Sequence, residues 1–211
     1  MQATPSPSAQ SIIATLGVGD DTGDTVVRLM MAAADAIGES GFPATTTRDI
    51  ASRAGLSPAG VYVHFSSKEE LLFELSRRGH VTARDLLVAA AQEATSPTEA
   101  LRAIIGGFSR WHAEHHLLGR IVQIEFRHLI PEHRDEVLRL RREIDAVVAD
   151  VIREGVEAGE FEVPDPRSTA LALLSIAIDV SRWYTPEVRR TPEEIEVANG
   201  ELAVRLVRSC E

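Results

Sequence analysis

One segment, residues 46–68, constrains the fold most, because it contains the stop and start signals of two short helices around a tight turn. Thr46 is followed three residues later by Asp49, the spacing of a capping box in which each side chain serves the other's backbone amide. Gly55 stands where a helix commonly ends in a left-handed residue, a conformation that costs glycine little. These signals predict a short helix that begins after Thr46 and ends before Gly55.

A second short helix is predicted directly after the turn. Serine is a favoured N-cap and proline is tolerated at the first helical position, so Ser57 and Pro58 form a start signal. The next residues, Ala59 and Gly60, are small and allow the helix backbone to approach the floor of a DNA groove. Two short helices joined by a glycine turn form the helix-turn-helix pattern, whose second helix enters the major groove.

Candidate DNA contacts lie along this segment. Hydroxyl, imidazole and ammonium groups can hold phosphates, while arginine or a close backbone reaches base edges. We assign phosphate contacts to Thr46, Ser57, Tyr62, His64 and Lys68. We assign the small tip and the base-edge positions to Pro58, Arg48, Ala59 and Gly60. The alternative is that Tyr62 and His64 are merely packed and that Lys68, the only lysine of the chain, is merely solvated.

The order of these residues carries a resemblance. Gly55, Ser57, the stretch Tyr62-Val63-His64-Phe65 and Lys68 resemble the DNA-binding module of the TetR family of bacterial repressors. One departure is Pro58, because the family often has a polar or basic residue after the serine. The resemblance implies a three-helix head on a helical ligand-binding body, and a function as a transcriptional repressor that binds a palindromic operator.

Charge limits the kind of DNA binding that is expected. The formal net charge is −10, which argues against a protein that coats nucleic acid by bulk electrostatics. Residues 42–68 hold three basic side chains against one acidic side chain, a net of +2, so the remainder carries −12. A locally positive face on an acidic body suits selective binding to one double-stranded site. A ligand-independent architectural DNA-binding protein is the alternative that this balance disfavours.

Cysteine content and hydropathy bear on the compartment. The single cysteine, Cys210, permits no intrachain disulfide and fits a reducing cytoplasm. No run of apolar residues approaches the ~18 that a membrane span needs, and no Lys or Arg precedes Arg28, unlike the start of a secretion signal. We therefore expect a cytoplasmic protein without a membrane partner, and a disordered arm over residues 1–22.

Apolar residues recur at helical spacing along the rest of the chain, which predicts an all-α protein of about nine helices. We expect a DNA-binding head over residues 23–70, beginning with a helix from Asp24 to Ser40, and an antiparallel body over residues 71–211. The body helices are predicted at about residues 67–94, 97–112, 118–129, 131–158, 167–184 and 192–209. The last two are apolar enough to pair with a second subunit as a homodimer, as paired operator half-sites require, although they could instead only complete the monomer core.

Two features of the body raise the question of a ligand. Gly106 and Gly107 each cost about 1 kcal/mol in a helix, so they indicate that a neighbouring helix or a ligand comes close. The histidines His112, His115 and His116 share a helical face, but no cysteine or paired carboxylate stands beside them. We therefore expect no metal and no cofactor. A metal-dependent hydrolase built on these histidines is the alternative.

The body also resembles a known domain. Glu125-Phe126-Arg127-His128-Leu129 with Pro131, residues 154–161, Asp165-Pro166 and Arg182-Trp183-Tyr184 resemble the ligand domain of a TetR subgroup that regulates fatty-acid and steroid breakdown. The inducers of that subgroup are acyl-CoA thioesters. The resemblance implies a regulator that is not an enzyme and that a small-molecule effector, an acyl-CoA thioester, releases from DNA. We assign ligand binding to Phe108, Trp111, Glu125, Arg127 and Trp183.

Overall fold

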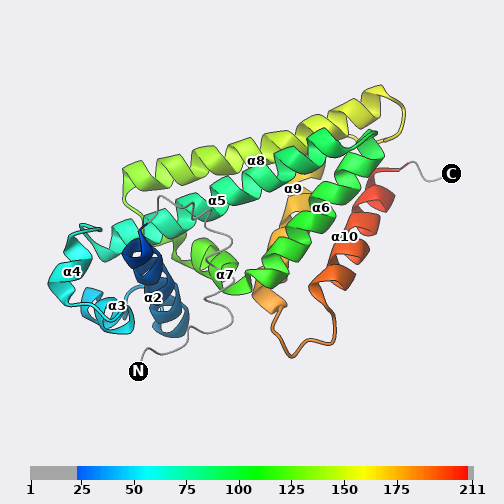
Figure 1. Ribbon diagram of the computed structural model, residues 1–211. Helices are drawn as coiled ribbons and strands as arrows, with labels where there is room; N and C mark the ends of the chain where they lie inside the picture. Colours follow the sequence, from blue (N-terminus) through cyan, green and yellow to red (C-terminus); the bar gives the residue numbers. More distant parts are fainter. Residues whose placement is uncertain (1–22, 209–211) are drawn as a thin grey trace. The chain divides into compact units, whose positions relative to one another are not determined.

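The computed structural model describes residues 23–208, so the predicted N-terminal arm and Cys210 lie outside the described residues. Every regular element between residues 23 and 208 is helical, and the all-α prediction is confirmed. The elements are α2 (Asp24–Ser40), α3 (Thr47–Arg53), α4 (Pro58–Tyr62), α5 (Lys68–Glu93), α6 (Pro97–Glu114), α7 (His116–Ile124), the 3-10 helix η1 (Glu125–His128), α8 (Pro131–Glu157), α9 (Pro166–Trp183) and α10 (Pro192–Val207) (Figure 1).

The chain forms two compact units. Unit 1 contains the described residues up to Thr82 together with Leu117–Leu138, and unit 2 contains Ala83–His116 and the described residues from Arg139 onward. Helices α5 and α8 therefore each contribute one part to each unit. Apart from its first residue, His116, the segment α7–η1 from the middle of the chain belongs to the same unit as α2, α3 and α4. The predicted domain boundary near residue 70 falls inside α5 and stays a prediction.

Unit 1 is built around α2, which packs against α3, and α3 in turn packs against α4. Helix α7 also approaches α2 closely, because a Cβ added at Gly38 would lie 2.5 Å from Cδ1 of Leu117. The apolar side chains buried in this unit come from several helices and loops, and larger ones among them are Leu29, Met30, Ile37, Ile50, Val61, Phe65, Leu71, Leu72, Leu75, Leu118 and Ile121. Helices α3 and α4, called the reading helices below, thus share a core with α5 and α7.

Unit 2 has a core formed by the second parts of α5 and α8 with α6, α9 and α10. Helix α6 packs against both α9 and α10. Added Cβ atoms would lie 2.8 Å from a backbone oxygen at two positions, Gly106 against Glu196 and Gly200 against Arg102. The space predicted at Gly106 is therefore filled by a neighbouring helix, α10. Nothing lies within 4 Å of a Cβ built at Gly107.

One sequence prediction is wrong in detail. The helix predicted over residues 118–129 instead ends at Ile124 and continues as the 3-10 turn η1. The tighter turn accompanies the burial of Glu125, whose carboxylate accepts a tertiary hydrogen bond. Helix α9 leaves Leu171 53% exposed, because the single chain covers only one of its faces.

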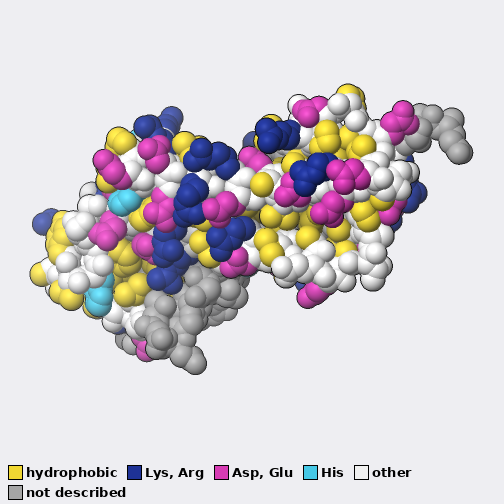
Figure 2. Space-filling model, turned by 90° about the horizontal axis from the view of Figure 1, so that it is seen from above, with side chains coloured by type: hydrophobic (Ala, Val, Ile, Leu, Met, Phe, Trp, Pro, Cys, Tyr) yellow, Lys and Arg dark blue, Asp and Glu magenta, His cyan; other side chains and the backbone are white. Residues whose placement is uncertain are grey.

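Basic and acidic side chains are interleaved on the face of the molecule seen in Figure 2. In unit 2, Arg84 pairs with both Asp85 and Glu143, at 2.7 and 3.1 Å. In unit 1, Arg77 and Arg78 both pair with Glu74 at 3.0 Å. Much of the basic charge of these helices is thus matched locally by carboxylates. Among the described residues, no helix combines the length and apolar character that a membrane span requires.

Candidate DNA-binding surface and effector region

The capping box predicted at the start of α3 is present. The Thr46 hydroxyl accepts from the Asp49 amide at 3.2 Å, and the Asp49 carboxylate accepts from the Thr46 amide at 3.0 Å and from its hydroxyl at 2.6 Å. The hydrogen bonds from Thr46 hold the pKa of the Asp49 carboxyl below its usual value. The carboxylate is therefore ionised near neutral pH, where it complements the positive N-terminal end of α3.

The turn between α3 and α4 also follows its local sequence. Gly55 has a φ of 69°, the left-handed conformation expected there. Ser57 is the N-cap of α4, and its hydroxyl oxygen accepts from the Gly60 amide at 3.1 Å. Pro58 is the first residue of α4, where no amide hydrogen is needed. The start of the second helix is confirmed in each of these details.

Most of the predicted DNA contacts lie on the surface of unit 1. Val61 and Phe65 face the core. Gly60 is half-buried, and the exposed residues are Thr46, Arg48, Ser57, Pro58, Ala59, Tyr62 and His64. The Ser57 hydroxyl accepts its capping bond and so keeps its own hydrogen for another acceptor. This surface presents donors beside a small, uncharged helix tip.

Lys68 differs from the other candidates because its amino group is turned toward the protein. The Nζ atom donates to the carbonyl oxygens of Phe42 at 2.7 Å and Thr45 at 2.8 Å, and lies 3.5 Å from that of Pro43. It also sits 4.4 Å from the centroid of the Phe42 ring. An ammonium group has three donors, and three carbonyl oxygens surround this one. Lys68 therefore holds the loop between α2 and α3.

Glu125 reaches the same loop from η1. Its Oε1 atom accepts from the Phe42 amide at 3.2 Å, and both residues are buried. The Nε2 atom of His128 lies 3.4 Å from Oε2 of Glu125, but it accepts from Arg127 and leaves Oε2 without a hydrogen bond. The His128 ring stacks on Phe42 at 5.1 Å between centroids. The α2–α3 loop is therefore fixed by Lys68 through its carbonyls and by Glu125 through an amide.

A second connection within unit 1 joins α5 to the start of α8. The Glu69 carboxylate accepts from the Ile130 amide at 2.9 Å and lies 3.0 Å from Nδ1 of His133. The His133 ring is stacked on Phe73, with centroids 3.8 Å apart. Neither Glu69 nor Glu125 carries a sequence signal for these partners, which lie 61 and 83 residues away.

The five predicted ligand-binding residues fall into both units. Phe108 and Trp111 belong to unit 2, where Phe108 is buried and Trp111 is half-buried against it. The indole nitrogen of Trp111 is buried without a hydrogen-bond partner. Trp183 is 40% exposed on α9. Glu125 and the exposed Arg127 belong to unit 1, so these five residues do not form one cluster within either unit.

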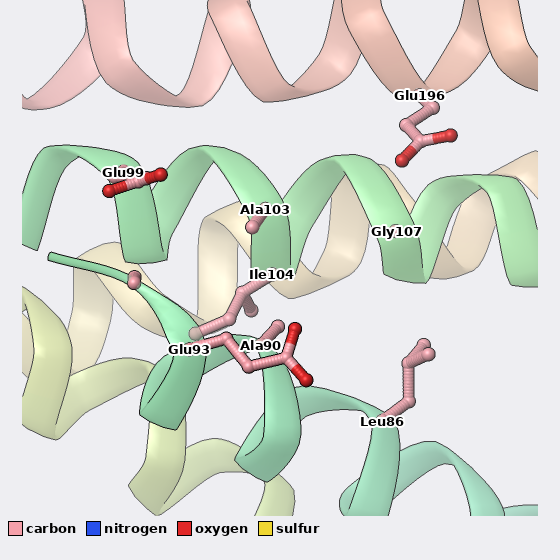
Figure 3. A pocket seen from close by; sticks show the side chains of 9 residues that line it. Leu86, Ala90, Glu93, Glu99, Ala103, Ile104, Gly107 and Glu196 are labelled. Carbon is pink, nitrogen blue, oxygen red and sulfur yellow. The ribbon is translucent and has the colours of Figure 1, made fainter.

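Two clefts open on unit 2, and neither is lined by these five residues. One has a volume of about 400 Å³ and lies among α5, α6 and α10, with Glu93, Glu99 and Glu196 along it (Figure 3). The other has a volume of about 420 Å³ and includes Asp150 and Glu154. The three carboxylates at the first cleft and the two at the second disfavour a phosphate-bearing ligand there, since like charges repel.

The histidines considered as metal ligands instead contact α6 itself, near its C-terminal end. Nδ1 of His112 lies 2.9 Å from the Phe108 carbonyl, and Nδ1 of His116 lies 3.0 Å from the Ala113 carbonyl. Burial lowers the pKa of His115 to about 4. Over residues 23–208, no group of three or more His, Cys, Asp or Glu side chains is arranged to hold a metal ion.

Comparison with known proteins agrees with this arrangement. The family described as bacterial regulatory proteins, tetR family, matches residues 29–75, and the tetracyclin repressor-like C-terminal domain matches residues 94–207. The transcriptional repressor KstR2 of Mycobacterium tuberculosis is 30% identical over 173 residues, which cover 79% of this chain and 84% of that protein.

Solved structures have the same fold. A tetR-family regulatory protein from Rhodococcus RHA1 has a TM-score of 0.85 and 34% identity, covering 90% of this chain and 100% of its own. AibR, solved in complex with isovaleryl coenzyme A and operator DNA, has a TM-score of 0.77 and 22% identity, covering 88% of this chain and 98% of its own. The two family matches and the coverage of KstR2 lead to one conclusion. The chain belongs to the TetR family of bacterial regulatory proteins.

Proposed function

We propose that this TetR-family regulator is a repressor that binds a palindromic operator and is released from it by an acyl-CoA thioester. The observation that carries the proposal is the intact helix-turn-helix of α3 and α4, in which the uncharged N-terminal tip of α4 is exposed. The members of this chain's family are DNA-binding transcription regulators rather than enzymes. Because operator DNA is cytoplasmic in bacteria, we propose a cytoplasmic location.

For the DNA contacts, we propose two roles. The surface residues contact the operator directly: Ser57, Tyr62 and His64 at phosphates, and Arg48, Pro58, Ala59 and Gly60 near base edges. The Thr46 hydroxyl and amide both donate to Asp49, so a phosphate contact by Thr46 stays a prediction. Lys68 acts differently, because its amino group is surrounded by carbonyl oxygens of the α2–α3 loop. We propose that Lys68 supports operator binding by fixing the loop that precedes Thr46.

We propose a homodimer formed through α9 and α10. Five large apolar side chains on these helices are at least 40% exposed in the single chain, and they are Leu171, Trp183, Val197, Leu202 and Leu206. Two copies of one reading helix also need a two-fold axis to match a palindrome. The alternative, in which these helices only complete the monomer core, leaves this apolar surface without a role.

The effector proposal is supported by two observations. AibR, which shares the fold, was solved with isovaleryl coenzyme A, and KstR2 is named a ketosteroid regulator in its solved structure. In this chain, the indole N–H of Trp111 beside Phe108 has no hydrogen-bond partner. This N–H group can donate a hydrogen bond to a thioester carbonyl oxygen. We propose contact with Phe108 and Trp111. Glu125 is already engaged by Phe42, and for Arg127 and Trp183 ligand contact stays a prediction.

An effector can release DNA only by binding the two conformations of the protein with different affinities. A coupling of about 1–3 kcal/mol is typical of allosteric proteins, which corresponds to roughly 5–150-fold in operator affinity. Helix α7 directly follows α6 in the chain and belongs to the unit that holds the reading helices. We propose that displacement of α7 is the step that changes the position of those helices.

The test is a gel-shift titration of the purified protein on DNA from upstream of its own gene. Acyl-CoA thioesters of increasing chain length are added, with free coenzyme A and the free acids as controls. We expect salt-dependent, sequence-specific binding that at least one thioester reverses while its free acid does not. Failure to prefer the upstream DNA over random DNA would contradict the repressor and favour an architectural protein. Specific binding that no thioester reverses would contradict only the effector.

A further inference from the structure

The outward side of α4 is defined by its buried side. Val61 is fully buried and Phe65 is 5% exposed, so these two residues mark the direction of the core. Val63 has helical dihedral angles, φ −67° and ψ −29°, and both His64 and Phe65 donate to the Val61 carbonyl. Helical residues are separated by about 100°, so Val63 lies about 200° from Val61 and from Phe65. Val63 therefore points directly away from the core.

Val63 is also the most prominent side chain of that outward face. It is 78% exposed, the largest value among the exposed large apolar side chains of residues 23–208. Ala59 and Gly60, one turn earlier, share this face and have little or no side chain. A single exposed valine is ordinary on a protein surface. What distinguishes Val63 is its position at the outer edge of the helix that reads DNA.

The chemistry of α4 limits how it can recognise bases. None of its residues from Pro58 to Val63 is charged, and none carries an amide side chain. The bidentate pairs that arginine makes with guanine and asparagine or glutamine with adenine are therefore not available from this helix. The major groove also displays one apolar group, the C5 methyl of thymine, and aliphatic side chains recognise it by contact. Val63 is suited to this contact.

We infer that Val63 is a specificity-determining residue, which packs against a thymine methyl group in each half of the operator. The inference rests on the proposed function and extends it from binding to base choice. Its physical basis is the burial of apolar surface on both partners, since transfer of one methyl-sized group from water contributes about 0.8 kcal/mol, or about fourfold in affinity. Position 63 thus adds a preference for thymine to the contacts already proposed near base edges.

The test is a double-mutant cycle between the protein and the DNA. The upstream site is first located by footprinting with the wild-type protein, and each symmetric pair of thymines is then replaced by deoxyuridine, which lacks only the methyl group. Wild-type protein and the Val63→Ala variant are titrated on each duplex. Val156→Ala removes the same methyl groups from another exposed valine, on α8, and serves as the matched control.

We expect Val63→Ala to weaken binding about fourfold per half-site, and one deoxyuridine pair to weaken wild-type binding to the same extent. On that duplex, Val63→Ala should cost nothing further, while Val156→Ala should match the wild type on every duplex. The inference is overturned if Val63→Ala binds like the wild type, or if its loss is the same on every deoxyuridine duplex. Absence of any specific wild-type footprint would instead contradict the proposed function itself.

Discussion

The carboxylate of Glu125 accepts a hydrogen bond from the backbone amide of Phe42 at 3.2 Å, across 83 residues of sequence and inside one compact unit. This bond joins η1 to the loop that leads into α3. Because Phe42 is also held by Lys68 and stacked on His128, its position depends on two other segments of the chain, α5 and η1. The loop before the reading helices is therefore set by tertiary contacts.

Replacement of Glu125 tests this connection. Glu125→Ala leaves the buried Phe42 amide without an acceptor, and we expect a loss of about 1–3 kcal/mol in the free energy of unfolding. Glu125→Gln keeps an acceptor oxygen and supplies an N–H group facing Nε2 of His128, so its stability should stay near that of the wild type. Urea unfolding of both variants measures the difference. Equal stability of the alanine variant and the wild type would contradict the role given to this bond.

A substitution of Lys68 tests whether its amino group contacts a phosphate or holds the α2–α3 loop. If Lys68 holds the carbonyls of Phe42 and Thr45, Lys68→Met should lower stability by about 1–2 kcal/mol and weaken operator binding without changing its salt dependence. A lost phosphate contact would instead reduce the slope of log K against log salt by about 1. Arg48→Met, at an exposed position of α3, is the comparison that should leave stability unchanged. A reduced slope for Lys68→Met would show that it contacts phosphate.

Two adjacent glycines of α6 should respond in opposite directions to the same substitution. Gly106→Ala places a Cβ 2.8 Å from the Glu196 carbonyl oxygen, and the forced separation of α6 and α10 should cost about 1–3 kcal/mol. Gly107→Ala meets nothing within 4 Å, so the better helix propensity of alanine should stabilise the protein by about 0.5–1 kcal/mol. Thermal unfolding of the two variants gives the signs. Equal shifts of both melting temperatures would be inconsistent with this packing.

His115 makes the stability depend on pH. Burial lowers its pKa from an ordinary value of 6.5 to about 4, so the folded protein keeps it neutral. Between these values the unfolded chain binds a proton that the folded chain does not, and stability falls as the pH drops from 6.5 toward 4. Since the ring is not fully buried, we expect His115 to account for about 1–2 kcal/mol of that loss. His115→Gln should flatten the profile in this window, and parallel profiles would exclude the effect.

The proposed dimer predicts the result of a charge placed on α10. Leu206 is 55% exposed in the single chain, and Leu206→Glu should give a monomer that is folded but has lost most operator affinity, because only one half-site can then be held. Leu138→Glu alters an exposed leucine of α8 and should stay dimeric. Sedimentation and helical circular dichroism measure both properties. A dimeric Leu206→Glu variant would place the interface elsewhere.

The local sequence predicts the structure of residues 46–68 closely. The capping box of Thr46 and Asp49, the left-handed Gly55 and the N-cap at Ser57 depend on residues within a few positions of one another. Such signals are set by backbone geometry and need no knowledge of the fold. The helix predicted from Asp24 to Ser40 has these bounds in the structure, although no side-chain cap begins it.

The tertiary partners could not be predicted in this way. The inward position of Lys68 depends on carbonyls 23 and 26 residues earlier, and Glu125 was assigned to a ligand although its carboxylate meets Phe42. Periodicity identifies a charged residue in an apolar segment but does not identify its partner, because that depends on how distant helices pack. The end of α7 was misplaced for the same reason, since η1 begins at the residue that Phe42 engages.

The reciprocal contacts of Gly106 and Gly200 limit how unit 2 can deform. At these two positions the helices meet through backbone atoms, which cannot move aside by a change of rotamer. Helices α6 and α10 are therefore expected to move together as one rigid body. A bound ligand would therefore gain space where side chains of α5, α8 and α9 pack against this pair, and not between α6 and α10. The core can expand in one direction only.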